Sequence, residues 1–187
     1  MTLLVRNSAQ RYPALLALLL ALLAPPLWAD TAAQIESGSR KALEFLAAEV
    51  AGSARLLSKA HAVLVFPDIV KLGFGSGGQY GEGVLLVDDQ PLGYYAVAGG
   101  PFGLPLGSRF KAKVIVFTNE EALHQFRKNR AWQVGVDGNI APVRAGANGD
   151  INPAQLMQEP VVGFIFSEQG LADGLSFDEA KITRLAR

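Results

Sequence analysis

The chain has 187 residues, half of them apolar, and its 17 basic and 17 acidic side chains balance. This length and composition predict one globular domain with a hydrophobic core and exclude a disordered chain. The balanced charge excludes a general attraction to nucleic acid, and the absence of cysteine excludes disulfides, thiol catalysis, thiolate metal sites and a Cys-anchored lipoprotein.

The first 29 residues have the layout of a secretory signal peptide. Arg6 and Arg11 form a positive n-region, an apolar run covers 14–24, and Ala29 provides a small residue at the expected cleavage point. The apolar run is too short to span a bilayer. We therefore expect an exported protein, periplasmic or associated with the outer envelope, soluble or peripheral, with one domain over 31–187.

Helices are expected directly after this segment. Apolar residues near one helical stripe are Ile35, Leu43, Leu46 and Val50. Gly52-Ser53 is expected to separate this helix from a second short one at 54–60. The polar face of the long helix mixes acids with bases, whereas helices that lie on membranes are rich in Lys and Arg. Packing on the core is therefore the favoured interpretation, and a membrane-surface helix is the alternative.

Runs of β-forming residues follow, bounded by turn signals. The expected strands are 62–66, 84–87, 92–98, 110–117, 133–136, 140–143, 161–166, 174–177 and 181–185. Asp137-Gly138 predicts a hairpin, and Thr118 with Glu121 predicts a capping box that opens a further helix. This order predicts an α+β fold: a strongly curved antiparallel sheet or barrel-like β core, with N-terminal helices and one further helix packed alongside.

The glycine-rich segment 73–83 matches the letters of a dinucleotide fingerprint at Gly73, Gly75 and Gly78. The fingerprint needs a helix that starts within the motif, because the helix N-terminus holds the pyrophosphate. A β-type run follows here instead. The segment is therefore interpreted as a curved strand in which glycine permits bends or close backbone approach.

No motif predicts a catalytic site, a metal or a cofactor. His61 and His124 lack the spacing of zinc ligands, and Ser76 does not lie in a nucleophile elbow. The short polar residues at 137–150 do not reproduce a calcium loop and are better explained as turn formers. A hydrolase assembled from distant residues is the weakest alternative, and it would need a cleft with a carboxylate beside one of the histidines.

Two neighbouring features have the chemistry of an interface. Arg109, Lys111 and Lys113 alternate with apolar residues, so a strand would place the three cations on one face, where they would contact phosphate head groups. A merely solvated face, or a charged edge strand, is the alternative. The preceding loop holds the apolar residues Phe102, Leu104 and Leu106, which would either insert into a bilayer or fold inward to close the sheet.

Several ordered motifs between 42 and 187 resemble the SYLF domain family. They are Val63-Leu64-Val65-Phe66-Pro67, Lys71-Leu72-Gly73-Phe74-Gly75, Gly78-Gln79-Tyr80-Gly81-Glu82-Gly83, Gly93-Tyr94-Tyr95, Phe102-Gly103-Leu104, Trp132-Gln133-Val134-Gly135-Val136-Asp137-Gly138, Gly170-Leu171 and Lys181-Ile182-Thr183-Arg184. The resemblance implies a lipid-binding module. Some members bind phosphoinositides through a basic N-terminal helix, and yeast-type members also bind actin.

The expected function is non-enzymatic, peripheral binding of anionic phospholipid at the cell envelope. The expected contacts are Arg109, Lys111, Lys113, Phe102, Leu104 and Leu106. Actin is not an expected partner, because export would remove the protein from cytosolic filaments, and nucleic acid is not expected either. The alternative function is an envelope structural or protein-interaction module without a lipid ligand.

Overall fold

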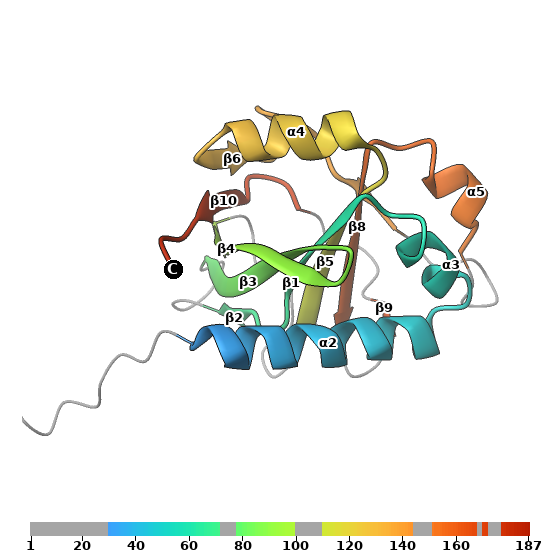
Figure 1. The fold of residues 1–187 in the computed structure, drawn as a ribbon, viewed down its shortest axis with the longest axis horizontal. Helices are drawn as coiled ribbons and strands as arrows, with labels where there is room; N and C mark the ends of the chain where they lie inside the picture. The colour runs from blue at the N-terminus through green and yellow to red at the C-terminus, as the bar shows by residue number, and fades with distance from the viewer. Residues whose placement is uncertain (1–29, 72–77, 100–109, 144–150, 168–169, 172–176) are drawn as a thin grey trace, which may run out of the picture.

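A computed structural model of the protein describes residues 30–71, 78–99, 110–143, 151–167, 170–171 and 177–187, apart from the side chains of Lys71, Phe110, Lys111 and Ser167. Its centre is one curled sheet with the strand order β6-β10-β4-β3-β1-β5-β8-β7, in which β2 also pairs with β3 and β9 with β8 (Figure 1). The strands are β1 (Ala62–Phe66), β2 (Val70–Lys71), β3 (Gln79–Val87), β4 (Gln90–Ala98), β5 (Phe110–Phe117), β6 (Ala131–Gln133), β7 (Ala141–Pro142), β8 (Val161–Ser167), β9 (Gly170–Leu171) and β10 (Lys181–Arg184). The predicted α+β architecture with a curved, mostly antiparallel sheet is confirmed.

The helices are α2 (Ala32–Glu49), α3 (Ser53–Leu57), α4 (Glu120–Lys128) and α5 (Pro153–Leu156). Figure 1 shows α2 and α4 on opposite sides of the sheet. Thr31 and Gln34 form a capping box at the start of α2. Gly52, with φ of +93°, provides the left-handed conformation that separates α2 from α3. The predicted helix pair and its break are therefore confirmed.

The sheet buries both of its faces. On the side that we call the α2 face, Ile35 and Leu46 of α2 pack over Val65, Val114 and Phe164. On the α4 face, the core contains Leu64, Ile115, Phe117, Ile165 and, from α4, Phe126. Neighbouring residues of β5 and β8 thus alternate between two apolar layers, and α2 belongs to the core, as predicted.

The β3–β4 hairpin follows the sequence prediction closely. Its turn consists of Asp88 and Asp89, both with positive φ (49° and 60°). Such a two-residue turn matches the right-handed twist of the paired strands. Gln90 and Pro91, which lie between the expected strands 84–87 and 92–98, already belong to β4. The turn lies where the sequence places it and is two residues shorter.

The predicted capping box of α4 is wrong. Asn119, not Thr118, caps α4, because its side chain accepts the Ala122 N–H at 2.8 Å. The Thr118 hydroxyl instead donates to the Glu159 carbonyl at 2.6 Å and ties the end of β5 to the segment before β8. Either residue type caps a helix well, so the long-range contact decides between them.

The predicted hairpin at Asp137-Gly138 does not form. A tight turn is present, in which the Gln133 N–H donates to the Asp137 carboxylate at 2.7 Å. The two flanking strands diverge after this turn, however: β6 pairs with β10, and β7 pairs in parallel with β8. The short helix α5, which is not among the elements expected from the sequence, is capped by the side chain of Asn152.

Candidate functional site

Strand β5 contains Lys111 and Lys113 of the predicted cation row, and the structure places this strand in the interior of the sheet. It pairs with β1 on one side and with β8 on the other. Ala112 and Val114 face α2, while Ile115 and Phe117 belong to the opposite core layer. The prediction that one face of β5 is exposed to solvent is therefore wrong. The alternative, that β5 is a charged edge strand, is wrong as well.

The simple alternation of the row also fails. The pairing of β5 with β8 shifts register between Phe110 and Ala112, which leaves Lys111 at a β-bulge. A bulge adds one residue to a strand, so residues on its two sides no longer keep the period of two. The side chain of Lys111, together with Arg109, Phe102, Leu104 and Leu106, lies outside the described residues.

Lys113 is the member of the predicted site that the structure describes. It is only 4% exposed. Its register partners are Phe66 on β1 and Ile165 on β8, both in the core layer of the α4 face. Its neighbours Ala112 and Val114 face the other way. Lys113 thus projects to the apolar α4 face of the sheet, and the prediction of a solvent-facing Lys113 is wrong.

The ammonium group of Lys113 has an unusual environment. Its Nζ lies 5.0 Å from the centroid of the Phe177 ring, a cation–π distance. Among the described residues it takes part in no hydrogen bond and no ion pair. Burial disfavours the charged form and lowers the pKa of Lys113 from 10.5 to about 8. The group is therefore a largely desolvated cation, and the compensating group that the described residues place beside it is an aromatic ring.

A second polar cluster, which the sequence analysis missed, ties the two ends of the domain together. Glu82 on β3 accepts a hydrogen bond from Tyr80 at 2.8 Å and forms an ion pair with Arg187. Arg187 also donates to the backbone carbonyl of Asp30. Burial, followed by the hydrogen bond to Glu82, raises the pKa of Tyr80. The ion pair between Glu82 and Arg187 joins residues more than 100 positions apart. No local sequence pattern predicts it.

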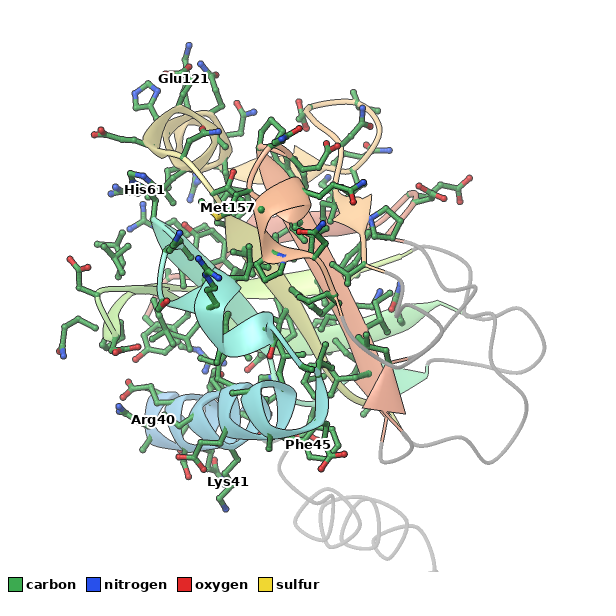
Figure 2. All side chains as sticks on the ribbon, turned by 90° about the vertical axis from the view of Figure 1, so that its right-hand side faces the viewer. Arg40, Lys41, Phe45, His61, Glu121 and Met157 are labelled. Carbon is green, nitrogen blue, oxygen red and sulfur yellow. The ribbon has the colours of Figure 1, made fainter. Side chains whose placement is uncertain are left out.

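The neighbouring hydrogen bond fixes α2 to the sheet. The Tyr94 hydroxyl on β4 donates to Glu36 at 2.5 Å, and Glu36 also pairs with Arg40 at 3.5 Å. The hydrogen bond to Glu36 raises the pKa of Tyr94. Lys41 points away from the sheet on the outer side of α2 (Figure 2). These contacts hold α2 against β4.

The histidines do not assemble a site within the described residues. His61 and His124 are exposed, and neither hydrogen bonds to a carboxylate there. Figure 2 shows His61 at the start of β1. In the same part of the chain, no three His, Asp or Glu side chains converge as a metal site would require. None of the helices described has the length and apolar character of a bilayer span.

No protein-family model matches the sequence, and no curated protein matches it. The resemblance to the SYLF family therefore stays a prediction.

Proposed function

We propose that the protein is a non-enzymatic, peripheral binder of anionic phospholipid, exported to the cell envelope, in which Lys113 pairs with the anionic head group. The observation that carries the proposal is the buried ammonium of Lys113, which has the Phe177 ring but no counter-ion among the described residues. The signal-like N-terminus and the SYLF resemblance support the same function.

An anion is the ligand that this environment favours. A cation held away from water has lost most of its hydration, so a negative group brought to it recovers a large electrostatic interaction. A hydrogen bond between charged groups contributes about 1.5–3 kcal/mol net. The apolar layer around Lys113 on the α4 face, formed by residues such as Phe66 and Ile165, suits an amphiphile better than a free inorganic ion.

The rest of the membrane affinity must come from other groups, since one cation does not hold a protein on a bilayer. Phe102, Leu104 and Leu106, which precede β5 in the chain, are assigned to insertion at the acyl boundary on the basis of the sequence. Each apolar side chain that leaves water would contribute about 1.5–3 kcal/mol. The proposal thus combines apolar insertion with recognition of one anionic group.

Vesicle sedimentation tests this function. We expect the protein to pellet with vesicles that contain phosphatidylglycerol and to stay in solution with pure phosphatidylcholine vesicles. Lys113→Met keeps the length of the side chain and removes its charge, and it should weaken binding by about tenfold. Methionine is chosen because a buried glutamate would unfold the domain and hide the effect.

Lys41→Met is the matched control, because it removes the same charge from the outer side of α2. It should bind within about twofold of the wild type, as expected of an exposed cation far from the site. Competition with inorganic phosphate separates a head-group site from a general anion site. Absence of pelleting with anionic vesicles at low salt, or equal pelleting by the Lys113 and Lys41 variants, contradicts the proposal.

A further inference from the structure

A pocket of about 720 Å³ lies at the end of the sheet covered by α4. Its floor contains three buried residues, Trp132, Ile140 and Val161, which are 4%, 7% and 8% exposed. The first turns of α4, the turn after β6 and the start of β8 form its walls. This volume and apolar floor are those of pockets that hold small organic molecules.

The rim of the pocket is acidic. It carries the exposed carboxylates of Glu121, Asp137 and Glu159, and the lining residues include no lysine, arginine or histidine. Asp137 accepts a backbone N–H and Glu121 accepts the Gln125 amide, but none of the three forms an ion pair within the described part of the chain. Three negative charges around one apolar cavity favour a cationic ligand.

A polar group in the floor points to a ligand as well. The indole N–H of Trp132 donates no hydrogen bond among the described residues, although the residue is 4% exposed. The indole edge with Nε1 lies beside Gly138, where a Cβ atom would be 3.5 Å from that nitrogen, and both residues line the pocket. The indole nitrogen is not among the fully enclosed, unpaired side-chain atoms of the described residues, so it keeps accessible surface at which a ligand that supplies an acceptor can pair with its N–H.

We propose that this pocket binds a small amphipathic amine, that is, a protonated or quaternary ammonium group on an aromatic or alkyl body. The body would cover Trp132 and Ile140, and the ammonium would face the carboxylates of Glu121 and Glu159. A free amine is favoured over an amine-bearing phospholipid head group, because the phosphate of the lipid would be repelled by the same carboxylates.

The pocket is separate from the lipid site. It adjoins Val161, which pairs with Phe117 of β5, whereas Lys113 pairs with Ile165. Four residues of extended strand separate the two positions, a length of about 14 Å. Binding of an amine therefore does not rest on the proposed lipid function, and failure of one proposal leaves the other standing.

The test uses the indole N–H resonance of Trp132 in ¹⁵N NMR spectra of the full chain. The probes are 2-phenylethylamine, its neutral analogue 2-phenylethanol and the anion 3-phenylpropionate. We expect the amine to shift this resonance saturably and with at least about fivefold higher affinity than the alcohol, and the anion to have no effect. Backbone amide resonances of α2, on the opposite side of the sheet, provide an internal reference.

Glu159→Gln removes one rim charge and should weaken binding of the amine by about fivefold. Glu49→Gln, on the exposed side of α2, should leave the affinity for the amine unchanged. Equal affinities for amine and alcohol, unchanged affinity in Glu159→Gln, or no shift of the Trp132 resonance up to about 10 mM amine would overturn the proposal.

Discussion

Lys113→Met is expected to raise the free energy of unfolding at neutral pH by about 3 kcal/mol. In the folded protein the pKa of Lys113 is lowered from 10.5 to about 8 by burial. Each pKa unit corresponds to about 1.4 kcal/mol of preference for the neutral form, so keeping the charged form buried costs about 3 kcal/mol. A methionine of similar length removes this cost and fills the same apolar space.

The increase in the free energy of unfolding caused by Lys113→Met depends on pH. Because the folded pKa lies below the unfolded one, the unfolded chain binds more protons between about pH 8 and pH 10.5. The stability of the wild type relative to the variant therefore rises across this window. The advantage of Lys113→Met is full below pH 8 and disappears above pH 10.5.

Urea unfolding of both proteins at several pH values measures this difference directly. Comparison with Lys41→Met, which removes an exposed charge, separates burial from net charge, and this control should change stability by less than about 0.5 kcal/mol. A Lys113→Met protein that is less stable than the wild type, or a difference that does not depend on pH, would show that the ammonium is well solvated or paired.

Gly83→Ala is expected to destabilise the protein by at least about 3 kcal/mol or to prevent folding. Gly83 lies in β3, where a Cβ atom would be 2.2 Å from the carbonyl oxygen of Val65 and 2.6 Å from the ring of Phe66. The first contact is with backbone of the paired strand β1, which cannot move without breaking the sheet. The close approach that the glycine-rich sequence predicts is therefore present at this residue.

Gly78→Ala is the matched control. A Cβ atom at Gly78, at the edge of β3, meets no atom within 4 Å. The same substitution should therefore change the free energy of unfolding by less than about 0.5 kcal/mol there. Circular dichroism and urea titration of both variants check the pair. A Gly83→Ala protein as stable as Gly78→Ala would show that β1 and β3 lie farther apart than the structure places them.

The sequence contains enough local information to predict the main elements. β1 and β5 begin and end where apolar β-forming runs do, and the Asp88-Asp89 turn marks the β3–β4 hairpin. The periodicity of 35–50 predicts correctly that α2 packs on the core. These predictions succeed because each depends on residues within a few positions of one another.

The candidate site depends on contacts that the local pattern does not contain. Alternation along β5 predicts two faces, but it does not reveal that α2 covers one and the curled sheet encloses the other. Lys113 therefore appears solvent-facing in the sequence and is buried in the fold. In the same way, the Asp137-Gly138 turn is local, whereas the partners of its flanking strands, β10 and β8, are distant in the chain.

The buried ammonium of Lys113 is proposed to bind the anionic group of a phospholipid. NMR titration of the Lys113 side chain, with and without a short-chain phosphatidylglycerol, tests it most directly. An anion beside the ammonium stabilises the charged form, so the pKa should rise from about 8 by at least about one unit when the lipid binds. A pKa that stays at about 8 in the presence of saturating lipid would contradict the claim.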